Sequence, residues 1–84
     1  MIAKVKSASF IDSMKIELND CNGKPVKAVL LDETGSICSE METRVNEPIS
    51  ELTWKGLNDL PYGVYTLELT HGAEQFRVRI VKRI

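Results

Sequence analysis

Turn-forming residues recur along this chain at intervals that leave little room for a helix. Clusters of Gly, Pro, Asn and Asp stand in the segments NDCNG (19–23), DETG (32–35), VNEP (45–48), LPYG (60–63) and THG (70–72). These residue types favour turns, because they supply positive φ, a preset φ, or side-chain hydrogen bonds to the nearby backbone. The short stretches between them therefore predict β-strands.

Within those stretches apolar and polar residues alternate, which is the period of a half-buried strand. In the segment 74–83 three apolar side chains (Phe76, Val78 and Ile80) alternate with the exposed side chains of Arg77 and Arg79. About seven such strands at this spacing predict an all-β fold, an antiparallel two-sheet β-sandwich with Greek-key connections. The predicted core consists of Met14, Ile16, Leu30, Leu52, Trp54, Tyr65, Leu67, Leu69, Phe76, Val78 and Ile80.

The turn before the tyrosine strand has a specific backbone requirement. Pro61 presets its own φ, and Gly63 tolerates a positive φ without steric cost. The Gly-x-Tyr element is therefore expected to be a tight turn that directs Tyr65 into the core. Tyr62, three residues earlier, is expected to be exposed.

Length, composition and net charge limit the classes of protein to which the chain can belong. With 84 residues the chain is expected to form one domain, and 43% hydrophobic with 27% charged residues is typical of a soluble globular protein. The net charge of −1 argues against a nucleic-acid partner. No apolar run is long enough for a transmembrane segment, and no signal peptide is visible, so the chain is either cytosolic or a fragment of a longer exported protein.

The charges are unevenly distributed. Residues 31–51 contain six acidic residues and one arginine, a net −5, whereas residues 71–84 contain four basic residues and one glutamate, a net +3. This asymmetry predicts either a charged partner, or attraction between two strands of the same molecule, or simply two solvated faces.

No arrangement of residues typical of catalysis is present, and we expect no enzymatic activity, no cofactor and no metal. The only histidine, His71, stands in the THG turn, where an exposed and inert side chain is expected. No phosphate-binding glycine loop or metal-binding spacing occurs. Asp20, Asp32 and Asp59 are expected to cap turns, with a weak calcium site as the alternative.

Cys21 and Cys38 are compatible with two free thiols or, in an exported protein, with one disulfide.

From about residue 13 to residue 84 the chain resembles the carboxy-terminal sorting domain of type IX secretion cargo. The resemblance rests on D-x-x-G at Asp32–Gly35, L-x-x-L-P-x-G-x-Y at Leu57–Tyr65, L-x-x-G at Leu69–Gly72 and R-I-V-K at Arg79–Lys82. It implies a small immunoglobulin-like β-sandwich excised from the carboxy terminus of a longer exported protein. Such a domain acts in the periplasm, at the outer membrane or cell surface, or is secreted, and is recognised by a translocon, a shuttle and a sortase.

The resemblance also implies which residues are recognised. The motif positions are Asp32, Gly35, Gly63, Tyr65, Gly72 and Lys82. The basic carboxy-terminal strand adds Arg77, Arg79 and Arg83, which together with Lys82 are expected to face solvent.

Other functions remain open from the sequence. The main alternative is a stand-alone or appended secreted β-sandwich that binds protein or carbohydrate. A homodimer formed through an edge strand is a further expectation.

Overall fold

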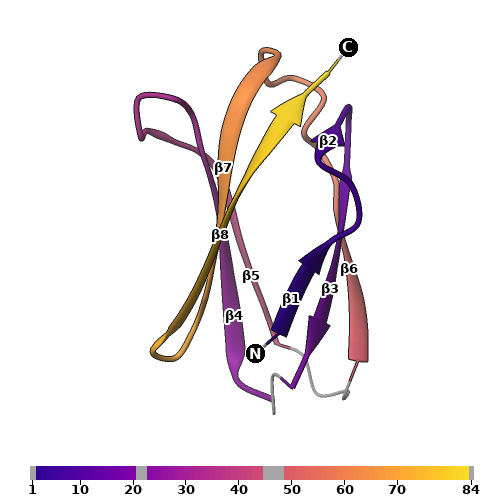
Figure 1. The fold of residues 1–84 in the computed structure, drawn as a ribbon, viewed down its shortest axis with the longest axis vertical. Helices are drawn as coiled ribbons and strands as arrows, with labels where there is room; N and C mark the ends of the chain where they lie inside the picture. Colours follow the sequence, from indigo (N-terminus) through magenta and orange to yellow (C-terminus); the bar gives the residue numbers. More distant parts are fainter. Residues whose placement is uncertain (1, 21–22, 45–48, 84) are drawn as a thin grey trace.

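A computed structural model of the protein describes residues 2–20, 23–44 and 49–83. In these residues all regular structure is β-strand (Figure 1). The eight strands are β1 (Ile2–Val5), β2 (Ser9–Phe10), β3 (Met14–Asn19), β4 (Pro25–Leu31), β5 (Ile37–Arg44), β6 (Ile49–Trp54), β7 (Gly63–His71) and β8 (Glu74–Lys82). The all-β prediction is confirmed. No helix that could cross a bilayer occurs in the described part of the chain.

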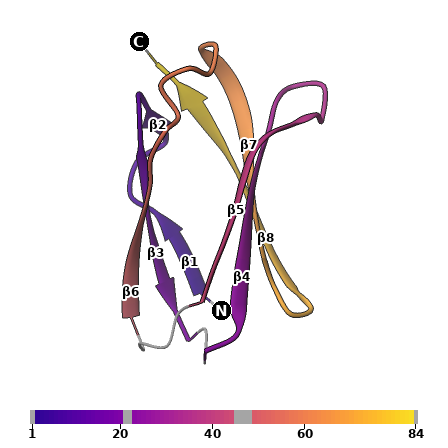
Figure 2. The same cartoon turned by 180° about the vertical axis from the view of Figure 1, so that it is seen from behind.

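The strands form two sheets that lie face to face, as the view from behind in Figure 2 also shows. One sheet has three strands in the order β1-β3-β6, and the other has five in the order β2-β8-β7-β4-β5. The prediction of an antiparallel two-sheet sandwich of about seven strands agrees with the structure in the two sheets and approximately in the strand number, but it is wrong for the orientation of one strand. The structure has an eighth strand, β2, and it pairs in parallel with β8 through Ser9–Val81 and Phe10–Lys82.

The core lies between the two sheets and is filled by the inward side chains of both. Of the eleven predicted core residues, Leu52, Phe76 and Val78 are only partly buried at its margin, and the other eight are buried. The buried core also includes Phe10, Leu18, Val26, Ala28 and Leu57. Leu57 lies outside any strand, and its backbone N–H donates to the carbonyl of Asp12 at 3.0 Å.

Strand β7 is the centre of the five-stranded sheet, between β8 and β4. Its inward row begins with Tyr65, Leu67 and Leu69 and continues to His71, which is only 4% exposed. The prediction of an exposed turn histidine is therefore wrong. The strand runs two residues further than the turn signal suggested, and the two-residue turn of the β7–β8 hairpin begins at Gly72.

The oppositely charged segments do not pair with each other. The acidic strand β5 pairs with β4 and the basic strand β8 pairs with β7, so two strands separate them in the sheet. The charged side chains on the outer face, Glu40, Glu42 and Arg44 of β5 and Arg77 and Arg79 of β8, are exposed, as predicted for solvated faces. Attraction between two strands of one molecule therefore does not explain the asymmetry.

The central strand predicts a clear stability contrast between its two faces. Leu67→Ala should lower the free energy of unfolding by about 2–5 kcal/mol, because Leu67 is fully buried and its removal leaves a cavity. Val64→Ala, on the outer face of the same strand and 37% exposed, should cost less than about 1 kcal/mol. Urea unfolding monitored by tryptophan fluorescence measures both; equal losses would contradict the assignment of the core.

Candidate functional site

Five of the six motif residues lie at one end of the five-stranded sheet. Asp32 and Gly35 form the turn between β4 and β5, while Gly63 and Tyr65 begin β7. Lys82, near the end of β8, is the strand partner of Gly63. Gly72 does not join them, because the β7–β8 hairpin lies at the opposite end of the sheet (Figure 1).

The Asp32 side chain organises the β4–β5 turn. Its Oδ1 atom accepts hydrogen bonds from the Thr34 backbone N–H at 2.9 Å, the Thr34 hydroxyl at 2.6 Å and the Ser36 backbone N–H at 3.0 Å. The backbone N–H of Gly35, with φ of 87°, donates to the Asp32 carbonyl at 3.1 Å. Asp32 therefore caps a turn, as predicted, and this carboxylate oxygen is already occupied.

These hydrogen bonds stabilise the ionised carboxylate. The hydroxyl of Thr34, followed by the backbone N–H of Ser36, lowers the pKa of Asp32 below its ordinary value. The turn is therefore held most firmly when Asp32 is charged.

The Tyr65 side chain holds the end of the β6–β7 connection against β7. Its hydroxyl donates to the carbonyl of Pro61 at 2.5 Å, while its ring is buried. Gly63 between them has φ of 150°, a value that favours glycine. The tight turn that directs Tyr65 into the core is thus present, and Tyr62 in the same turn is 71% exposed, as predicted.

Strands β2 and β8 close the same end of the core. The ring of Phe10 on β2 meets the ring of Tyr65 edge-on, with centroids 6.1 Å apart. Lys82 on β8 is 5% exposed, and its Nζ atom donates to the carbonyl of Arg83 at 3.0 Å. The prediction of an exposed Lys82 is wrong, because this residue continues the inward row of Phe76, Val78 and Ile80.

The three arginines of the basic strand are exposed, as expected from the alternation. Arg77 forms an ion pair with Glu68 of β7, with Nη2 and Oε2 at 2.8 Å. Arg79 lies opposite Thr66. The backbone N–H of Arg83 donates to the carbonyl of Phe10 at 2.7 Å, which fastens β2 to the end of β8.

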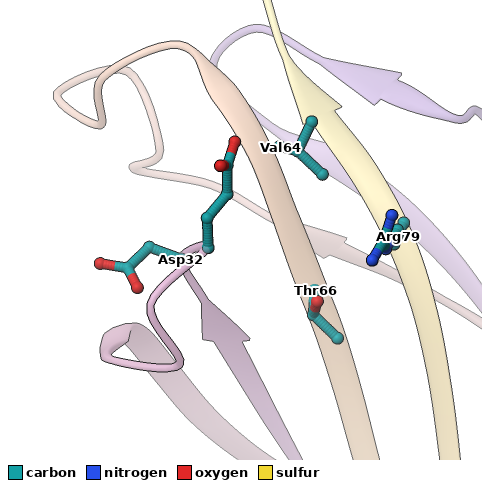
Figure 3. A pocket seen from close by; sticks show the side chains of 5 residues that line it. Asp32, Val64, Thr66 and Arg79 are labelled. Carbon is teal, nitrogen blue, oxygen red and sulfur yellow. The ribbon is translucent and has the colours of Figure 1, made fainter.

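Two neighbouring depressions mark the outer surface of this end. The first, of about 330 Å³, is lined by Asp32, Glu33, Val64, Thr66 and Arg79. Figure 3 shows Val64 and Thr66 on β7 beside Arg79 on β8, with Asp32 where β4 ends.

The second depression, of about 310 Å³, shares Asp32, Glu33 and Val64 with the first. It extends from them to Cys38, Pro61 and Tyr62. Together they form a shallow surface with acidic, basic, hydroxyl and apolar groups. We call this surface the motif end.

Two side chains with reactive groups, Cys38 and His71, lie at opposite ends of the five-stranded sheet. Desolvation of the thiol by its neighbours, together with the negative charge of Asp32, raises the pKa of Cys38, which favours the less nucleophilic protonated form. His71 is the last residue of β7 and lies beside Glu74 at the β7–β8 hairpin. This hairpin is at the opposite end of the sheet from the motif end, so His71 cannot act as a base for Cys38. Among the described residues, no group of three or more His, Cys, Asp or Glu side chains is placed to hold a metal ion.

The two cysteines differ in what the structure shows of them. Cys38 is an exposed free thiol on β5. Cys21 lies outside the described residues, as does the VNEP segment, so the predicted turn there is not described either.

Comparison with known proteins does not assign this chain to a family. No protein-family model matches its sequence, and no curated protein matches it either.

The Tyr65 hydroxyl predicts a measurable stability effect. Tyr65→Phe should lower the free energy of unfolding by about 1–2 kcal/mol, because the carbonyl of Pro61 loses its partner while the ring stays packed. Tyr62→Phe removes a hydroxyl from the same turn at an exposed position and should leave stability unchanged. Chemical denaturation of the pair distinguishes them, and equal midpoints would show that the hydroxyl bond does not stabilise the fold.

The Asp32 turn predicts a specific acid sensitivity. A carboxyl whose folded pKa is depressed stabilises the protein above its unfolded pKa of about 4, and this contribution disappears as pH falls through the folded value. Asp32→Asn should therefore flatten the loss of stability between about pH 5 and pH 2. Thermal unfolding across that range is the measurement; parallel curves for the two proteins would contradict the prediction.

Proposed function

We propose that this domain is a non-catalytic sorting domain that directs an attached cargo across the outer membrane by the type IX system. The observation that carries the proposal is the meeting of Asp32, Gly35, Gly63, Tyr65 and Lys82 at one end of the sheet. These positions run from residue 32 to residue 82, and the fold brings them to one end of the sheet. A translocon component, shuttle or sortase would recognise the exposed surface at this end.

We propose further that the sandwich is immunoglobulin-like with Greek-key connections. Two observations support this. The strand order β1-β3-β6 against β2-β8-β7-β4-β5 places the first strands in different sheets, with β2 added in parallel to the last strand. The bond from Tyr65 to Pro61 has the geometry of a tyrosine corner, a feature of immunoglobulin-like sandwiches.

Most of the motif residues hold the backbone in place, and the side chains exposed at the surface belong to their neighbours. Tyr65 and Lys82 are buried and Asp32 is engaged within its turn. The side chains of Glu33, Tyr62 and Val64 are exposed around them. A recognising protein would therefore contact these three side chains, on a backbone held in place by the motif.

The exposed aromatic ring also supports a second function. Tyr62 is 71% exposed and lines a depression that contains both hydroxyl and acidic groups. An exposed ring beside polar groups suits the binding of a peptide or a carbohydrate by a secreted interaction module. The two functions differ in whether the domain alone suffices for export.

An export assay tests the sorting proposal. The whole domain is fused behind a reporter that carries a Sec signal peptide, in a bacterium that has a type IX system. The intact fusion is expected at the cell surface or in the medium. The double variant Tyr62→Ser/Glu33→Gln should accumulate in the periplasm, because it changes the exposed part of the motif end and leaves the buried part intact.

Point substitutions are preferable to deletion of residues 81–84. That deletion would remove the buried Lys82 and the backbone bond from Val81 to Ala8, so it would damage the fold together with the signal. Ile2→Ser is the matched control, since Ile2 is an exposed apolar residue on β1. Retention of the intact fusion in the periplasm would overturn the sorting proposal, whereas export of the double variant would reject only the assigned surface.

A further inference from the structure

The five-stranded sheet has two open edges that carry opposite charge. On one side β2 covers only Val81 and Lys82, and within the described residues no strand pairs with the rest of β8 on that side. On the other side β5 is the last strand of the sheet among the described residues. Unpaired edges are templates for pairing with a further strand.

The backbone groups of Arg77 and Arg79 point out of the β8 edge. The N–H of Val81 donates to the carbonyl of Ala8, the residue before β2, so the backbone groups of Val81 point away from β7. Backbone groups alternate in direction along a strand, and the β7–β8 register is continuous. The N–H and C=O groups of Arg77 and Arg79 are therefore directed outward as well.

The backbone groups of Glu40 and Glu42 point out of the β5 edge by the same reasoning. The N–H of Asp32 donates to the carbonyl of Ser36, so even-numbered residues at this end of β4 face β5. The β5 residues opposite them in the register, such as Met41 opposite Ala28, direct their backbone groups toward β4. Glu40 and Glu42 alternate with these β5 residues, so their backbone groups point away from β4.

We propose that β5 of one molecule pairs with β8 of a second copy, which extends the five-stranded sheet from molecule to molecule. Successive strands β8, β7, β4 and β5 are antiparallel, so two copies in the same orientation bring β5 antiparallel to β8. In the register that aligns the outward groups, Arg77 lies opposite Glu42 of the second copy. Arg79 then lies opposite Glu40 of the second copy.

The charges select this pairing over symmetric ones. Opposite charges directly across a strand pair stabilise it, and like charges destabilise it. Pairing two β8 edges would set arginines against arginines, and pairing two β5 edges would set glutamates against glutamates. The contact is therefore heterologous, and it builds open chains unless a rotation closes them.

The lengths of the two open segments also match. On β8 the open edge ends where β2 begins at Val81. On β5 the register shifts at the start of the strand, between the partners of Leu30 and Leu31, and such an irregularity bends a strand. Residues 75–79 of β8 can therefore pair with residues 40–44 of β5, while the bent beginning of β5 passes β2.

Some of the charge at these edges is engaged within the molecule and some is available. Arg77 forms an ion pair with Glu68 of the same molecule, and the Nζ atom of Lys27 lies 4.0 Å from Oε2 of Glu40. In the described part of the chain, Arg79 and Glu42 form no ion pair. Within the sheet Glu42 lies opposite Lys27 and Arg79 lies opposite Thr66. Among the described residues, Arg79 therefore gains an acidic partner directly across a strand pair only from the second copy.

Sedimentation velocity tests the inference on the whole chain, with a reductant present because Cys38 is exposed. The mass-average molecular weight should rise with protein concentration from micromolar to millimolar. It should fall when salt is added, because exposed charges are screened. Glu40→Lys/Glu42→Lys should lower the association constant by about tenfold or more, since two attractive cross-strand pairs become repulsive.

Two further samples make the result specific. Asp12→Lys/Asp59→Lys changes the net charge equally at exposed positions outside β5 and β8 and should associate like the unaltered protein. Arg77→Glu/Arg79→Glu should be monomeric alone and should associate again when mixed with the Glu40→Lys/Glu42→Lys variant. A protein that stays monomeric at every concentration would overturn the inference, as would association that all variants share.

Discussion

The hydrogen bond from Tyr65 to the carbonyl of Pro61 fixes the end of the β6–β7 connection, the last point at which the chain passes from one sheet to the other. β6 ends in the three-stranded sheet at Trp54, and β7 begins in the five-stranded sheet at Gly63. The bond holds the end of this connection on the first residues of β7, and the buried ring then meets Phe10. Since Phe10 lies in β2, which pairs with β8, this one corner positions three strands of the larger sheet.

The alternation of apolar and polar residues predicted the strands, and the inward rows of β7 and β8 extend beyond the apolar residues to His71 and Lys82. His71 continues the inward row of β7 by two positions, and Lys82 does the same in β8. Both were predicted to be exposed because a histidine beside a turn glycine and a lysine near a terminus usually are. The period of the strand was the stronger signal, because in a paired strand the backbone fixes the direction of every side chain.

Other features depend on contacts that no local pattern reveals. β2 has only two residues, too few for alternation, and its parallel pairing with β8 is set by the packing of Phe10. Leu57 is buried from a loop, where no period applies. The candidate site was predicted as a set of residues but not as a surface, because only the strand order brings the Asp32 turn beside Tyr65. Gly72, which belongs to the same sequence pattern, lies at the far end.

The same geometry explains why a motif in a small β-domain says so little about function by itself. Asp32 closes a turn, Gly63 adopts a φ that other residues avoid, and Tyr65 locks a corner, so each is required by the fold whatever the domain binds. Function must be sought in side chains that the fold does not need. Tyr62 at the motif end and the charged residues of the β5 and β8 edges meet that condition, since they are exposed and contribute little to the core. They are therefore the positions where recognition can change without loss of the fold.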